Sequence, residues 1–165
     1  MNLIKTQIQE IVKILKEVAD PEIPVISLVD LGIIRDIKVD DNQITITISP
    51  TYSGCPALDV IPVLIHEALE KAGFSGIIVK NDISEAWSTD WISKEGKQAL
   101  KAYGIAPPEQ RGTDLQTIPF EERIVLCPQC GSANTSMTSK FGSTPCKSLF
   151  KCNDCLEPFD YFKCH

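Results

Sequence analysis

Two Cys-x-x-Cys pairs near the end of the chain constrain its folding more than any other feature of the sequence. The first pair is Cys127 and Cys130, and the second is Cys152 and Cys155. Four thiolates on two turns can close a tetrahedron around zinc and leave no open coordination position. The 21 residues between the pairs leave room for a β-hairpin. A segment of about 40 residues buries little apolar core, so we expect a metal to stabilise it. The pattern therefore predicts a zinc ribbon over residues 125–165.

The choice between zinc and iron stays open, because four cysteines can also form a rubredoxin-like iron site. Three further residues of the tail can ligate metals. Cys146 is followed by Lys147, whose charge favours a thiolate. We expect Cys146 to be a buried residue of the ribbon, with a share in metal ligation as the alternative. We do not expect Cys164 and His165 to be primary ligands, since terminal residues are often mobile.

The seventh cysteine, Cys55, is isolated from the others. It follows residues 43–49, where apolar and polar residues alternate as in a half-buried strand. It precedes residues 56–72, where apolar residues recur at helical spacing and proline occupies the favoured first position. This arrangement predicts that Cys55 lies at or near a helix N-cap. Unpaired N–H groups and the helix dipole there favour the thiolate.

The periodicity of the first part of the chain predicts the order helix, strand, strand, helix, strand. The expected ranges are 6–19, 33–39, 44–49, 56–72 and 74–83. The first two strands are expected to pair as a hairpin. The order favours an α+β fold, in which a small three-stranded sheet carries helices on one face.

The domain organisation follows from changes in composition along the chain. Residues 93–103 read as a further helix, which closes a first domain over 1–103. A polar, proline-containing stretch over 104–124 predicts a linker, and the ribbon over 125–165 follows it.

The composition excludes some functions. A hydrophobic fraction of 43% and a charged fraction of 23% are typical of a globular protein. Neither a signal peptide nor a membrane-spanning run is evident, so we expect a cytoplasmic protein without a membrane partner. In that compartment cysteines serve metals rather than disulfides. The net charge is −6, and the tail from Leu126 onward has four lysines against three acidic residues. Neither part has the basic surface of a nucleic-acid binder.

Short motifs in both parts of the chain point to a known family. The motifs of the first part are Asp20-Pro21-Glu22-Ile23-Pro24, Leu31-Gly32-Ile33-Ile34-Arg35-Asp36 and Pro50-Thr51-Tyr52-Ser53-Gly54-Cys55-Pro56. Over roughly residues 5–88 the chain resembles iron–sulfur cluster assembly factors. Further motifs are Trp91-Ile92-Ser93, Tyr103-Gly104-Ile105-Ala106-Pro107-Pro108, Phe141-Gly142-Ser143-Thr144-Pro145-Cys146-Lys147 and Glu157-Pro158-Phe159. With the four-cysteine tail, they resemble the PaaD family. Its members are accessory proteins of phenylacetyl-CoA epoxidase, a monooxygenase of bacterial phenylacetate degradation.

The resemblance implies an assembly-type α+β domain, a structural zinc ribbon and an accessory rather than enzymatic role. Such a protein would help to insert an iron–sulfur cluster or iron into the epoxidase complex. Two components of that complex carry metal, namely a di-iron oxygenase and a reductase with a [2Fe–2S] cluster. Expected partners are these components and the iron–sulfur assembly machinery. The resemblance also places the transfer site at Cys55, with Asp20 and Glu22 nearby. A single cysteine per chain cannot hold a cluster alone, so a homodimer or a ligand from the client is required.

Two other functions remain as alternatives. A thiol-dependent redox enzyme could use Cys55, but a catalytic thiol normally needs a base. His66 is the only histidine of the first part, and a continuous helix would place it roughly 15 Å from Cys55. The other alternative is a scaffold protein that binds its partners through the zinc ribbon.

Overall fold

The computed structural model describes residues 2–40, 43–52, 54, 56–108 and 123–163. Contacts between residues divide the chain into two compact units, Met1–Trp87 and Ser88–His165. None of the helices in the described ranges combines the length and the apolar character that crossing a bilayer requires.

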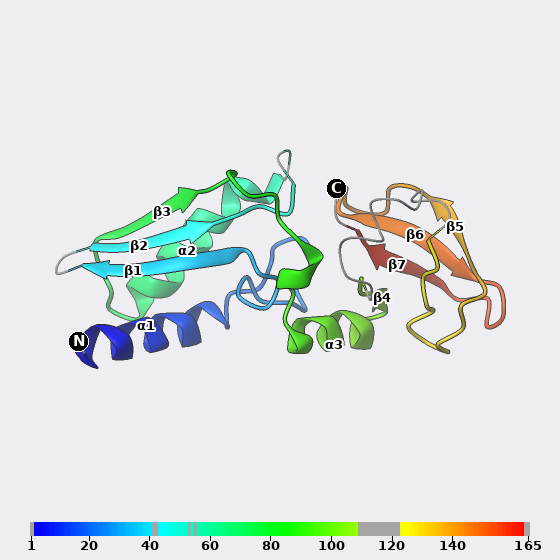
Figure 1. Ribbon diagram of the computed structural model, residues 1–165, viewed down its shortest axis with the longest axis horizontal. Helices are drawn as coiled ribbons and strands as arrows, with labels where there is room; N and C mark the ends of the chain where they lie inside the picture. Colours follow the sequence, from blue (N-terminus) through cyan, green and yellow to red (C-terminus); the bar gives the residue numbers. More distant parts are fainter. Residues whose placement is uncertain (1, 41–42, 53, 55, 109–122, 164–165) are drawn as a thin grey trace. The chain divides into compact units, whose positions relative to one another are not determined.

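The first unit is built on a three-stranded sheet with the order β1-β2-β3 (Figure 1). Its strands are β1 (Ile34–Asp40), β2 (Gln43–Ile48) and β3 (Ile77–Asn81). Strands β1 and β2 pair antiparallel, which confirms the expected hairpin. Strands β2 and β3 pair parallel. A parallel pair needs a crossover connection, which the helix between these strands provides.

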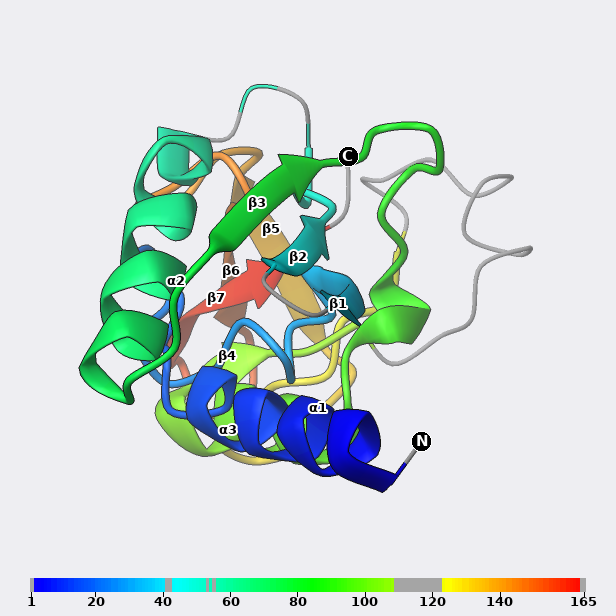
Figure 2. The ribbon, with the colours of Figure 1, turned by 90° about the vertical axis from the view of Figure 1, so that its left-hand side faces the viewer.

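Two helices, α1 (Asn2–Leu15) and α2 (Val60–Lys71), cover one face of this sheet (Figure 2). The alternation of apolar and polar residues along β2 explains why only one face is covered. Its three isoleucines are buried and its threonines are only partly buried. The helices contribute matching apolar stripes. The buried residues of these elements are Ile11, Leu15, Ile44, Ile46, Ile48, Ile61, Ile65 and Leu69. Burial of each such side chain stabilises the fold by about 1.5–3 kcal/mol. The expected α+β architecture is therefore confirmed.

The start of α2 differs from the sequence-based expectation of a helix from Pro56. A short 3₁₀ helix, η1 (Pro56–Leu58), comes first, and the α-helix begins at Val60. Proline cannot donate to an intrahelical hydrogen bond, so it is best tolerated in the first turn. Pro62 occupies such a position only because α2 begins at Val60. The helix ends at Lys71, close to the expected end at residue 72, and Gly73 follows with a φ of 90°.

The second unit contains a four-stranded sheet with the order β4-β7-β6-β5. Its elements are η2 (Thr89–Trp91), α3 (Lys94–Tyr103), β4 (Ile105–Ala106), β5 (Thr135–Ser139), β6 (Lys147–Cys152) and β7 (Pro158–Phe162). The helix expected over 93–103 is α3, and Gly104 caps it. Strands β5, β6 and β7 form the antiparallel ribbon. Its core joins Phe150, Phe159 and Tyr161 to the buried cysteines Cys127 and Cys152.

The boundary between the two units lies earlier than composition indicates. The sequence predicts a first domain over residues 1–103, whereas the contacts assign the chain from Ser88 onward to the second unit. The cause is β4, which pairs parallel with β7 through Ile105 and Asp160. This pairing anchors α3, which directly precedes β4, to the ribbon. Residues 109–122 of the expected linker lie outside the described residues.

Candidate metal centre

The four cysteines of the two Cys-x-x-Cys pairs gather at one point of the second unit. Their sulfur atoms all lie within 4.8 Å of one another. The Sγ atoms of Cys127 and Cys155 are 3.7 Å apart, and those of Cys130 and Cys152 are 3.6 Å apart. Cys127 and Cys152 are buried, whereas Cys130 and Cys155 are exposed. The group therefore has an inner half in the ribbon core and an outer half at the surface.

Backbone hydrogen bonds form the turn that carries the first pair. The N–H of Gly131 donates to the carbonyl of Cys127, and the N–H of Cys127 donates to the carbonyl of Ser132, both at 2.9 Å. Gly131 has a φ of 75°, a conformation that glycine adopts without steric cost. The Cys-Gly sequence therefore suits the turn that brings both sulfurs of this pair to the same side.

The second turn has a related geometry but a different residue at the corresponding position. The N–H of Cys152 donates to the carbonyl of Glu157 at 2.9 Å. The N–H of Cys155 donates to the sulfur of Cys152 at 3.5 Å. Leu156 has a φ of 66°, and it is 63% exposed. A side chain in this conformation costs about 1–2 kcal/mol, so other interactions must hold the second turn in place.

Hydrogen bonds and neighbouring thiols shift the pKa values of Cys152 and Cys155 in opposite directions. The hydrogen bond from the N–H of Cys155 is the main reason why the pKa of Cys152 falls to about 7. The sulfur of Cys155 accepts a hydrogen bond from the N–H of Glu157, which lowers the pKa of Cys155. Partial desolvation and the three neighbouring cysteines outweigh that bond and raise the pKa of Cys155 to about 12. Without a cation, Cys152 can lose its proton near neutral pH, whereas Cys155 resists losing its own, because thiolates repel one another. A divalent cation removes this repulsion.

The geometry of the sulfurs fits a metal of that kind. Metal–sulfur bonds of about 2.3 Å in a tetrahedral site place neighbouring sulfurs about 3.8 Å apart. The separations of 3.6 and 3.7 Å between the paired sulfurs match this value. Four thiolates would fill the coordination sphere, so a metal bound here would join the two turns rather than bind substrate.

Polar residues next to the cysteines connect the two turns, although no sequence pattern assigns them a role. Asp154 accepts hydrogen bonds from the hydroxyl of Ser132 and from Nδ2 of Asn134. The signal available in the sequence is their position, since Ser132 and Asp154 belong to the Cys-Gly-Ser and Cys-Asn-Asp-Cys segments. Spacing alone could not show that they pair.

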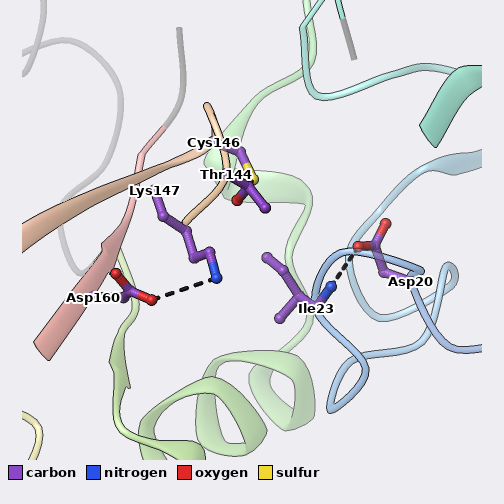
Figure 3. A network of polar contacts seen from close by, with 6 residues as sticks. All are labelled: Asp20, Ile23, Thr144, Cys146, Lys147 and Asp160. Atoms are coloured by element: carbon purple, nitrogen blue, oxygen red, sulfur yellow. Dashed lines mark hydrogen bonds and ion pairs between the residues drawn. The ribbon is translucent and has the colours of Figure 1, made fainter. Parts of the chain in front are cut away.

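The structure leaves Cys146 outside the group of four sulfurs. Cys146 is 4% exposed, and its Sγ lies 3.1 Å from Oγ1 of Thr144 (Figure 3). The following residue, Lys147, forms an ion pair with Asp160 at 3.4 Å. Cys146 is thus a buried residue of the ribbon, as the sequence indicated. Cys164 and His165 lie outside the described residues.

The Asp20-Pro21-Glu22 motif forms a tight turn in the first unit. Asp20 is 5% exposed, and its Oδ1 accepts the N–H of Glu22 at 2.9 Å and that of Ile23 at 2.8 Å. Figure 3 shows the bond from Ile23. The N–H of Asp20 donates to the carbonyl of Ile26 at 2.9 Å. Glu22 is partly buried. The carboxylate of Asp20 therefore stabilises the turn, whatever else it binds.

This geometry predicts different outcomes for two substitutions of Asp20. Asp20→Ala leaves two backbone N–H groups without their acceptor, so we expect a loss of about 1–3 kcal/mol in the free energy of unfolding. Asp20→Asn keeps an oxygen at the position of Oδ1, so we expect a clearly smaller loss. Urea denaturation of both variants measures the difference. Equal losses would show that the carbonyl-type oxygen is not what holds the turn.

Cys55 lies outside the described residues, but the segments on either side of it are described. Two hydrogen bonds hold the end of β2 in place, and a third joins Trp87 to the segment before β1. Ser49 N–H donates to Ile33, Asp82 N–H donates to Ile48, and Nε1 of Trp87 donates to the carbonyl of Leu31. The segment that leads to Cys55 therefore leaves the sheet at the end where β1 begins and β3 stops (Figure 1).

His66 is the histidine that the alternative enzymatic interpretation considers as a base for Cys55. It lies on α2 beside the buried stripe, and it is partly exposed. Its Nδ1 lies 4.0 Å from Oε1 of Glu70, one turn further along the helix. This contact gives His66 a partner on its own helix.

Comparison with protein families yields two matches that together span most of the chain. Residues 8–73 match a family described as iron–sulfur cluster assembly protein. Residues 112–163 match the PaaD zinc beta ribbon domain. The second match includes all four cysteines of the metal centre and Cys146.

Individual relatives agree with these matches. The chain is 42% identical to an Escherichia coli (strain K12) protein provisionally named as a subunit of 1,2-phenylacetyl-CoA epoxidase, over 96% of this chain and 93% of the relative. It is 35% identical to an Fe-S protein maturation auxiliary factor of Porphyromonas gingivalis, over 56% of this chain and 89% of the relative. Among solved structures, a domain of unknown function (DUF59) from Bacillus anthracis has a TM-score of 0.53 and 28% identity. The similarity covers 56% of this chain and 89% of the Bacillus chain.

Proposed function

We propose that this chain, which belongs to the PaaD family, is a maturation factor of the phenylacetyl-CoA epoxidase complex. In this role it delivers, or helps to insert, iron or an iron–sulfur cluster, and it does not catalyse the epoxidation. The observation that carries the proposal is the 42% identity to the Escherichia coli epoxidase protein over 96% of the chain. The similarity of the first part of the chain to an Fe-S protein maturation factor supports the type of activity.

The four-cysteine group holds a structural zinc ion in this proposal. The match to a zinc beta ribbon family favours zinc over iron, and the sulfur geometry accepts zinc. Cys127, Cys130, Cys152 and Cys155 are the ligands. When bound, the ion supplies the cross-link between the two turns and no redox chemistry. Cys146, which lies outside the group, contributes no ligand.

The transfer site of the proposal is Cys55, with Asp20 and Glu22 as neighbours. A thiolate is a good ligand for iron, and carboxylates can complete a weakly held site. A cluster needs more ligands than one chain offers at this position, so a second copy of the chain or the client must supply them. Weak binding suits a carrier, because the bound iron has to leave. The iron–sulfur assembly machinery is the expected source of the iron or cluster.

The experiment that tests this function is production of the epoxidase components with and without the chain. We expect the components made without it to contain less than half of the iron or acid-labile sulfide found when it is present. Iron in the oxygenase and sulfide in the reductase are measured separately, so the result also identifies the client. Equal metal contents in both components, with equal epoxidase activity, would overturn the proposal. Purified chain added to fully loaded epoxidase should leave the turnover rate unchanged, as expected of an accessory protein.

A further inference from the structure

The two cysteine turns are joined by a network of hydrogen bonds that contains no sulfur atom. At its centre is Asp154, which lies within the second turn between Cys152 and Cys155. Its Oδ1 accepts Nδ2 of Asn134 at 2.7 Å, and its Oδ2 accepts the hydroxyl of Ser132. Both donors belong to the chain that leaves the first turn. Each oxygen of one carboxylate therefore bonds to the opposite turn.

Further hydrogen bonds fix the orientation of these donors. The N–H of Asn134 donates to Oγ of Ser132 at 3.0 Å, which sets the two side chains relative to each other. From the second turn, Nδ2 of Asn153 donates to Oδ1 of Asn134 at 3.0 Å. The N–H of Asn153 donates to the carbonyl of Asn134 at 2.8 Å. Asn134 is thus held by both turns, and its amide can point only one way.

The stability that this network provides depends on how its hydrogen bonds are linked to one another. Its side chains lie at the surface, so a single hydrogen bond among them contributes modestly in water. Bonds to a carboxylate are stronger than neutral ones, and mutually oriented bonds support one another. None of the atoms of the network is a metal ligand, so its hydrogen bonds add to the bonds that the metal makes. In the folded ribbon the network holds the two turns at their separation, and it opposes their movement apart as the metal leaves.

We propose that Asp154 is a positioning residue that holds the two turns at the spacing a tetrahedral metal requires, and thereby slows release of the metal. This inference rests on the proposed zinc ion. Substitution of residues that orient a metal site typically costs 10–100-fold in affinity. For Asp154→Asn we expect release of zinc to an excess of colorimetric chelator to be about tenfold faster. Asn at this position offers one acceptor oxygen to two donors and points its amide at the other donor.

An exchange of two residues tests the mechanism without a change of net charge. In the double variant Asp154→Asn with Asn134→Asp, the amide of residue 154 can donate to the carboxylate of residue 134. We expect the release rate to return to within about threefold of the unsubstituted chain, as compensation in a double-mutant cycle requires. Asn134→Asp alone places two carboxylates side by side, so we expect it to speed release.

Two controls separate this mechanism from others. Glu157 contacts the turn through its backbone N–H and carbonyl, which Glu157→Gln preserves. The substitution removes a negative charge close to the turn but no bond of the network, so it should leave the release rate unchanged. Ser132→Ala removes one donor and should speed release by about threefold, which provides a milder variant if Asp154→Asn does not fold. An Asp154→Asn rate equal to that of Glu157→Gln, or a double variant as fast as the single ones, would overturn the inference. A chain that carries no zinc at all would instead contradict the proposed metal.

Discussion

Cys127→Ser should release the metal and unfold the ribbon. Cys127 is completely buried, and its sulfur lies 3.7 Å from that of Cys155. A serine hydroxyl does not replace a thiolate as a zinc ligand, so three ligands remain. Zinc binding to small four-ligand domains contributes about 10–16 kcal/mol, which is comparable to the whole stability of a small domain. We expect the zinc content to fall from about one ion per chain to less than about one fifth.

Zinc analysis and limited proteolysis measure this result, and Cys146→Ser is the matched control. Both substitutions exchange a buried ribbon cysteine for serine, but Cys146 lies outside the sulfur group. The Cys146→Ser protein should keep about one zinc ion and resist protease like the unsubstituted chain. The Cys127→Ser protein should be cleaved rapidly within residues 123–163. A Cys127→Ser protein with full zinc content and protease resistance would contradict the assignment of this ligand.

Cys55→Ala should leave the protein folded and deprive the epoxidase of its metal. The motivation is the position of Cys55 between β2 and η1, together with the family's assembly domain over residues 8–73. The variant keeps the buried residues that the structure describes in the first unit, such as Ile46, Ile61 and Ile65, so we expect its thermal unfolding to be unchanged within error. The epoxidase made with this variant should contain no more iron or acid-labile sulfide than epoxidase made without the chain.

Cys55→Ser tests whether the thiolate itself is required. Serine preserves the size and polarity of the side chain but is a poor ligand for iron. It should therefore fail in the same way as alanine. Fully loaded, active epoxidase made with either variant would refute the role of Cys55. Zinc content serves as the internal control, since both variants should retain the ribbon ion.

The elements with strong periodicity could be predicted from the sequence. The alternation over residues 43–49 identified β2, and its proximity to the preceding strand identified the hairpin. The helical spacing of Ile61, Ile65 and Leu69 identified the buried stripe of α2. The spacing of the two cysteine pairs identified the four sulfurs that the fold brings together. In each case one local pattern was sufficient, because burial acts on the same residues that carry the pattern.

Features that depend on partners distant in sequence could not be predicted. The assignment of α3 and β4 to the second unit depends on the pairing of Ile105 with Asp160, and two residues of strand leave no periodic signal. The start of α2 depends on the requirement that Pro62 lie in the first turn of the helix. For this reason α2 begins at Val60, after the 3₁₀ helix. The bond between Asn134 and Asp154 joins residues 20 positions apart. Polar residues in turns are common, so their types alone do not reveal such a pairing.

Metal analysis of the protein purified without oxygen measures directly whether Cys55 holds transferable iron. Zinc, iron and acid-labile sulfide are measured in the unsubstituted chain and in Cys55→Ala after incubation with ferrous iron and a sulfide source. We expect zinc in both proteins, and iron that remains after desalting only in the chain with Cys55. Equal iron in both proteins, or none in either, would show that Cys55 does not hold the iron.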